Sequence, residues 1–222
     1  MTKQNSTEIV FLVDRSGSMH TIAEDMKGGF KTFIEEQMKD PTGCNVSLYL
    51  FDDVFEEAFK QRPLSEVKEL PLQPRGNTAL LDAIGKSIVL TGERLAKLDE
   101  SERPEKVVFV IITDGGENAS KEYRDGAKIS EMITHQREKY SWEFVFLGAN
   151  QDSLKTARSL GISANNAVTY AANSAGSGKL MRGLSKGIGT FRRTTFDPRS
   201  DVPIYGQKQY DAEPEVPKPP RN

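Results

Sequence analysis

Two unbroken apolar runs, at residues 9–13 and 107–112, constrain the fold of this chain more than any other feature. Each run is continuous and does not alternate with polar residues, which is typical of a strand that is covered on both faces of a sheet. Further runs of strand length lie at residues 46–51, 144–147 and 167–170. Between the runs, apolar residues recur every three or four positions, as in helices with one buried face. This alternation predicts an α/β domain with a mostly parallel sheet.

The helices are expected at residues 22–38, 80–98, 127–133, 154–160 and 180–191. One connection between strands is different, because only Asp52 and Asp53 separate the run at residues 46–51 from an apolar stretch at residues 54–59. A connection this short permits only antiparallel pairing, so these two stretches are predicted to form a hairpin.

The ends of the chain differ from its middle. Residues 1–7 are polar and are assigned to an N-terminal lead, and residues 8–193 to the domain. Residues 194–222 hold six of the eleven prolines and are assigned to a proline-rich extension whose end is expected to be disordered. Proline removes backbone donors, so neither a helix nor a central strand is expected in this extension.

Composition excludes several classes of protein. The chain has 30 Lys and Arg against 32 Asp and Glu, so no field of one sign favours nucleic acid or an anionic membrane. Its single cysteine, Cys44, cannot form an intramolecular disulfide or a cysteine-based zinc site. No apolar run reaches the roughly 18–20 residues of a membrane helix, and the polar N-terminus lacks the apolar core of a signal peptide. We therefore expect a cytoplasmic protein without a membrane partner.

Oxygen-bearing side chains follow both of the long apolar runs. The first run leads into Asp14-Arg15-Ser16-Gly17-Ser18, and the second leads into Asp114. The carboxyl ends of parallel strands form the ligand-binding edge of such a sheet. Thr78 stands at the start of the helix predicted between the two apolar runs. Asp14, Ser16, Ser18, Thr78 and Asp114 offer five hard oxygen donors, which suit Mg²⁺, or else Mn²⁺ or Ca²⁺. Only two of the five are charged, so the site should hold metal weakly and leave a coordination position open.

This pattern resembles the metal-ion-dependent adhesion site (MIDAS) of von Willebrand factor A domains, which share Asp-x-Ser-x-Ser, a distant Thr and a further Asp. The resemblance spans roughly residues 7–192 and implies a Rossmann-like fold with a central six-stranded sheet and helices on both faces. It implies that Ser16 and Ser18 coordinate the metal directly, Thr78 directly or through water, and both aspartates partly through water. It also implies binding rather than catalysis, with an Asp or Glu of a protein partner completing the metal shell.

The segment Leu147-Gly-Ala-Asn-Gln-Asp152 is similar to stand-alone cytoplasmic members of this family in bacteria and their phages. This resemblance suggests a cytoplasmic ATPase as the partner. No catalytic residues are assigned.

Two alternatives stay open at this point. An aspartate after a buried first strand is also how haloacid-dehalogenase-type phosphatases place their nucleophile beside magnesium. Those enzymes need a second acid two residues later, where this chain has Ser16. Each residue of the pattern can also serve as a helix cap or turn former, which would make the chain a scaffold that needs no metal.

Several other charged residues are predicted to have no part in the site. Asp52 and Asp53 are read as turn residues, Arg15 as a solvated side chain, and His20 and His135 as surface residues. The basic face of the last helix comprises Lys179, Arg182, Lys186 and Arg193. It is read as the solvated side of the helix, so nucleic-acid binding is not expected. Glycines 183, 187 and 189 in that helix are expected to permit close packing against a neighbour.

Overall fold

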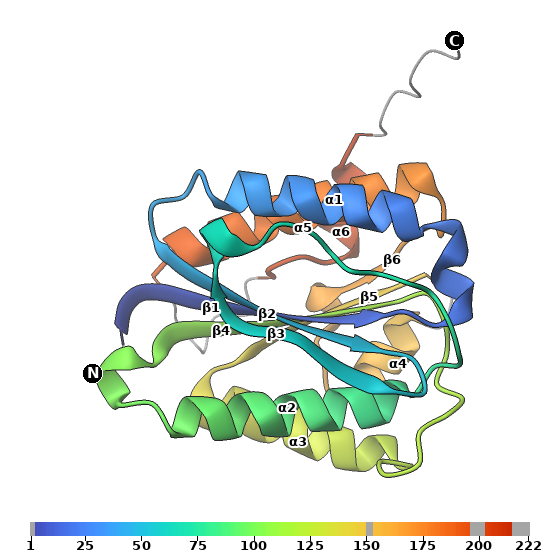
Figure 1. Ribbon diagram of the computed structural model, residues 1–222, viewed down its shortest axis with the longest axis horizontal. Helices are drawn as coiled ribbons and strands as arrows, with labels where there is room; N and C mark the ends of the chain where they lie inside the picture. The colour runs from blue at the N-terminus through green and yellow to red at the C-terminus, as the bar shows by residue number, and fades with distance from the viewer. Residues whose placement is uncertain (1–2, 150–152, 196–202, 215–222) are drawn as a thin grey trace.

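A six-stranded sheet divides the structure into two helical layers (Figure 1). The computed structural model describes residues 3–149, 153–195 and 203–214. The strands are β1 (Lys3–Asp14), β2 (Gly43–Phe51), β3 (Phe55–Pro63), β4 (Pro104–Thr113), β5 (Glu143–Gly148) and β6 (Ala167–Thr169). Their order in the sheet is β3-β2-β1-β4-β5-β6, and every pairing is parallel except that of β2 with β3. The predicted mostly parallel α/β sheet with one antiparallel edge strand is confirmed.

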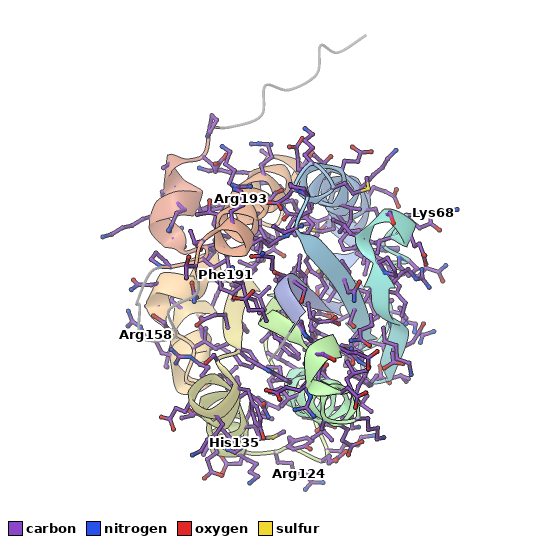
Figure 2. The ribbon with its side chains drawn as sticks, turned by 90° about the vertical axis from the view of Figure 1, so that its left-hand side faces the viewer. Lys68, Arg124, His135, Arg158, Phe191 and Arg193 are labelled. Atoms are coloured by element: carbon purple, nitrogen blue, oxygen red, sulfur yellow. The ribbon has the colours of Figure 1, made fainter. Side chains whose placement is uncertain are left out.

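Helices cover both faces of this sheet. The first face carries α1 (Ala23–Gln37), α5 (Ser174–Arg193) and α6 (Gln207–Ala212), and the second carries α2 (Leu80–Ala96), α3 (Gly126–Tyr140) and α4 (Ser153–Ser159). The described residues also form four short 3₁₀ helices, namely η1 (Gly17–Thr21), η2 (Leu64–Glu66), η3 (Glu100–Glu102) and η4 (Ala164–Asn166). Figure 2 shows the two layers end on, with Phe191 and Arg193 of α5 on one side of the sheet and His135 of α3 on the other.

The apolar run of β1 is continuous because alternate side chains enter different cores. Phe11 meets the rings of Phe30 and Phe33 on α1, each with its centroid 5.2 Å away. The neighbouring Val10 and Leu12 face the other way, into the core beneath α2 and α3. Burial on both faces accounts for the absence of polar residues in the middle of this strand.

The strand β1 begins earlier than its apolar run. Residues 3–7, which the sequence assigned to a lead, belong to the strand, and Ser6 and Thr7 pair with β2. Glu8 is buried and accepts hydrogen bonds from Ser47 (2.6 Å) and Arg94 (3.0 Å). Because such partners satisfy polar side chains inside the sheet, hydropathy alone placed the start of the strand too late.

The expectation that no helix follows residue 194 is wrong. Helix α6 fits between Pro203 and Pro214, so neither proline lies in its interior. The segment that carries it is also part of the core, since Ile204, Tyr205 and Tyr210 are buried. The expected disorder at residues 215–222 lies outside the described residues.

Among the residues that the structure describes, no helix is both long enough and apolar enough to span a membrane.

Candidate functional site

The two loops that carry the predicted metal ligands leave the same edge of the sheet. β1 and β4 are neighbours and pair in parallel, so Asp14 and Thr113 end adjacent strands. The loop before α2 reaches this edge as well, because Gly17 N–H donates to the Gly76 carbonyl (3.2 Å). Figure 1 shows η1 and the start of α2 at this end of the molecule.

Asp14 is the buried carboxylate of the site. Its side chain is 0% exposed, with Oδ1 accepting from Ser16 N–H (2.7 Å) and Oδ2 from the Thr113 hydroxyl (2.6 Å). Burial raises the pKa of this carboxyl to about 6, and its hydrogen bonds oppose that rise. A buried anion with only two donors lacks a full set of partners, which is the environment that a bound cation would stabilise.

The remaining ligands form the upper rim. The hydroxyl oxygens of Ser16 and Ser18 lie 3.1 Å apart, and Ser18 donates to Asp114 Oδ1 (2.6 Å). Asp114 is half-buried, and burial raises its pKa. Ser18 is exposed, so the rim of the site opens to solvent.

Thr78 lies across the site from the β1 loop, with Gly115 between them. A Cβ atom placed on Gly115 would lie 3.2 Å from Thr78 Oγ1, which is a tight contact, and 3.7 Å from Ser18 Oγ, which is an ordinary one. Asn118 holds the Thr78 backbone at both ends, since Asn118 Oδ1 accepts from Thr78 N–H (2.9 Å) and Asn118 N–H donates to the Thr78 carbonyl (3.0 Å). The structure thus brings together all five predicted side chains.

The donor set fits a hard divalent cation. Two carboxylates and three hydroxyls suit Mg²⁺ or Mn²⁺, and the hydroxyl protons can turn away from a metal. No group of three or more His, Cys, Asp or Glu suited to metal binding occurs among the described residues. Its donor set makes the mixed carboxylate and hydroxyl site a candidate metal site.

Two supporting residues escaped the sequence analysis. Thr113 donates to Asp14 and accepts from Gly115 N–H (3.2 Å), so it joins the two ligand loops beneath the site. Asn118 clamps Thr78, as described above. Thr113 stands at the end of an apolar strand and Asn118 in a polar loop, and neither position carries a spacing that marks a function.

Arg15 and Asp52 have roles that the sequence did not predict. Arg15 is buried, which contradicts its reading as a solvated side chain, and it pairs with Asp52 (2.9 Å) and Glu56. Asp52 is also paired with Arg75 (2.8 Å), while Asp52 Oδ1 accepts from Val54 N–H (2.5 Å). Burial opposes the ionised form, but the two arginines and Val54 N–H lower the pKa of Asp52 below its ordinary value. Asp52 therefore joins the loop of Ser16 to the loop of Thr78.

We expect Asp52→Asn to weaken both the fold and the metal site. The amide keeps the shape of the side chain but leaves the Arg15 guanidinium with only Glu56 as a counter-charge, which should cost about 3 kcal/mol of unfolding free energy. Since the two ligand loops meet through Asp52, Mg²⁺ affinity should fall about tenfold. Urea denaturation and titration calorimetry measure the two effects. Asp99→Asn is the control and should change neither, because Asp99 is exposed at the N-cap position of the short η3 and its side chain makes no capping hydrogen bond.

Other sequence expectations have mixed outcomes. His20 and His135 are exposed, as predicted. The basic face of α5 is not simply solvated, because residues 210–214 lie against it: Lys186 pairs with Glu213 (2.6 Å) and Arg182 donates to the Pro214 carbonyl (2.8 Å). The predicted close packing is confirmed at Gly183 and Gly187, where an added Cβ would lie 2.3 Å from the Tyr205 hydroxyl and 2.1 Å from the Ile204 carbonyl oxygen.

Solved structures share this fold at low sequence identity. Proximal thread matrix protein 1 from the mussel byssus, with a zinc-occupied MIDAS motif, aligns with a TM-score of 0.58 and 19% identity, covering 82% of this chain and 46% of that one. The ArnB paralog VWA2 from Sulfolobus acidocaldarius gives 0.51 and 18%, covering 81% and 44%. Manganese-loaded TRAP protein from Plasmodium vivax gives 0.52 and 14%, covering 77% and 70%. The chain spans about half the length of the first two proteins.

Sequence comparison identifies the family directly. No curated protein matches the chain by sequence. The sequence profile of the von Willebrand factor type A domain matches residues 8–182, well over half of the chain, and this range contains all five candidate ligands. The chain therefore belongs to the von Willebrand factor type A domain family.

Proposed function

We propose that this chain is a metal-dependent protein-binding module, in which a carboxylate of a partner completes the shell of a divalent cation. The observation that carries this proposal is the convergence of two carboxylates and three hydroxyls at an edge that is open on the side of Ser18. Five ligands do not fill an octahedral shell, so one position stays available to an outside oxygen.

Each residue has a defined task in this proposal. Asp14 supplies buried negative charge and is held by Ser16 N–H and Thr113. Ser16 and Ser18 present neutral oxygens, as does Thr78, while Asp114 supplies the second charge at the exposed rim. The cation, when bound, supplies the positive charge that attracts the partner's Asp or Glu, and a charge-assisted contact satisfies it better than water does.

Mg²⁺ is the proposed cation, because it prefers oxygen ligands and is usually bound through only one or two carboxylates, which matches this donor set. Zinc and manganese occupy the related structures named above, and those metals are properties of those proteins. A cytoplasmic location and an ATPase partner stay predictions that rest on the resemblance to stand-alone family members.

The geometry favours binding over phosphatase chemistry. Both Asp14 oxygens are engaged in hydrogen bonds and the side chain is 0% exposed, whereas a nucleophilic carboxylate must present a free oxygen to its substrate. The position two residues later is Ser16, which cannot act as a general acid at neutral pH. We therefore propose that the chain has no hydrolytic activity.

Partner capture tests the binding function. Protein immobilised through its N-terminus should retain a partner from native lysate in Mg²⁺ and release it in chelator, whereas the Asp114→Asn variant should retain none. Replacing the essential partner acid by its amide should abolish capture, since the amide keeps the shape and removes the charge. Capture that persists in chelator would instead indicate a metal-independent scaffold. Mg²⁺-dependent release of phosphate from a phosphate monoester, lost in Asp114→Asn, would favour the hydrolase.

A further inference from the structure

An exposed arginine stands beside the candidate metal site. Arg75 lies three residues before Thr78, and its side chain is 59% exposed. Its backbone N–H donates to the Arg15 carbonyl (2.7 Å), and the next residue accepts from Gly17 N–H. Arg75 therefore lies directly against the loop that carries Ser16 and Ser18.

The side chain of Arg75 is held in place despite its exposure. Its Nε donates to Asp52 Oδ2 (2.8 Å), and Asp52 itself is only 1% exposed and fixed by Arg15. Gly76 adds a tight turn with φ of +66°, where a Cβ would lie 2.0 Å from Asp53 Oδ1. An arginine anchored in this way has already lost much of the rotamer freedom that a flexible side chain loses on binding.

The two Nη atoms of Arg75 remain available as hydrogen-bond donors to a bound partner. Among the residues that the structure describes, none accepts a hydrogen bond from either Nη atom of Arg75. The nearby acids already have partners, since Glu56 pairs with Arg15 and Asp53 Oδ1 accepts from Asn77 N–H (3.2 Å). The neighbouring Arg15 is buried and cannot meet a partner.

We propose that Arg75 receives a second carboxylate of the same partner, so that the partner is an acidic segment with two nearby Asp or Glu residues. One acid completes the metal shell and the other meets the Nη atoms of Arg75. The inference rests on the proposed function and adds the chemistry of the partner to it. Arginine suits this task because its planar donors match a carboxylate, and lysine offers only a point charge.

Short acetylated peptides with amidated C-termini provide the test, with NMR titration of ¹⁵N-labelled protein at a Mg²⁺ concentration that saturates every variant. The two-acid peptides contain two Asp residues separated by one, two or three glycines, and in the one-acid peptides Asn replaces either Asp. At least one two-acid peptide should bind wild type five- to twentyfold more tightly than its one-acid counterparts, and added salt should reduce that gain.

Variants separate this contact from the metal contact. Within the Arg75→Gln variant, two-acid and one-acid peptides should bind with equal affinity, whereas Arg75→Lys should keep part of the gain of the second acid. Lys68→Gln, which removes an exposed charge from the same connecting segment, should keep all of it. Figure 2 shows Lys68 at the surface of the molecule.

Each outcome decides one of the two proposals. Equal affinities for one-acid and two-acid peptides at all three spacings would overturn the role of Arg75, as would a full gain that persists in Arg75→Gln. One-acid peptides that bind equally well in Mg²⁺ and in chelator would contradict the metal contact itself. If no peptide binds in Mg²⁺, the proposed function fails, and the inference that rests on it fails with it.

Discussion

Asp14→Asn should abolish Mg²⁺ binding while leaving the metal-free fold intact. Asp14 supplies one of only two charges in the site, so its neutralisation should weaken Mg²⁺ binding at least a hundredfold in titration calorimetry. The amide can replace the carboxylate structurally, since its oxygen can accept from Ser16 N–H and its NH₂ can donate to Thr113 Oγ1. The Thr113 hydroxyl would then donate to the Gly115 carbonyl, which lies 3.0 Å away.

The stability of this variant has a definite expected sign. Burial raises the pKa of Asp14 to about 6, so in the metal-free protein at pH 7 the ionised carboxylate opposes folding. This cost is present above the folded pKa and is lost as the pH falls through 6 toward the unfolded value. At pH 7 without metal, the melting temperature of Asp14→Asn should therefore equal or exceed that of wild type. Added Mg²⁺ should raise the melting temperature of wild type and leave that of Asp14→Asn unchanged. Asp25→Asn, at a half-buried position where Asp25 accepts a hydrogen bond from Ser174, is the matched control and should bind Mg²⁺ normally. Unchanged Mg²⁺ affinity in Asp14→Asn would show that the site is wrongly assigned.

Deletion of residues 203–222 should cost the domain about 5 kcal/mol of unfolding free energy. The deletion removes Ile204, Tyr205 and Tyr210 from the core, and burial of an apolar or aromatic side chain is worth roughly 1.5–3 kcal/mol. A loss of this size is a large part of the stability of an ordinary domain, about 5–15 kcal/mol, so the melting temperature should fall steeply. Urea denaturation measures the loss.

Two further variants sharpen this result. Truncation after Pro214 keeps every described contact of the segment and should leave stability nearly unchanged. Gly187→Ala should reproduce much of the loss, because its Cβ would lie 2.1 Å from the Ile204 carbonyl oxygen and force the segment away. If deletion from residue 203 left stability unchanged, the described packing of Ile204 and Tyr205 would be contradicted.

The sequence predicted the central strands of the sheet, but it missed the first residues of β1 and helix α6. The strands in the centre were visible because burial on both faces leaves continuous apolar runs, as in β1 and β4. The first residues of β1 were missed because Glu8 is satisfied by Ser47 and Arg94, and a hydropathy pattern does not show such partners. Helix α6 was missed because prolines were taken to exclude helix throughout the extension, although Pro203 and Pro214 only bound it.

The site shows the same division between local and long-range information. Asp14, Ser16 and Ser18 could be recognised because they follow one another in a single loop, and Asp114 because it ends the second buried strand. The roles of Thr113 and Asp52 depend on contacts with residues 99 and 37 positions away in the chain. A single sequence carries no record of such contacts, so the burial of Arg15 and the exposure of Arg75 emerged only from the structure.

Anomalous diffraction from crystals soaked in Mn²⁺ tests the central claim most directly, because it places the cation without assuming its ligands. The account predicts one strong peak at the carboxyl end of β1 and β4, about 2 Å from Ser16 Oγ and Ser18 Oγ and adjacent to Thr78 and Asp114. The peak should be absent from crystals of Asp14→Asn. A strong peak elsewhere, with none among these five side chains at saturating Mn²⁺, would contradict the assignment of the site and the carboxylate-binding function that depends on it.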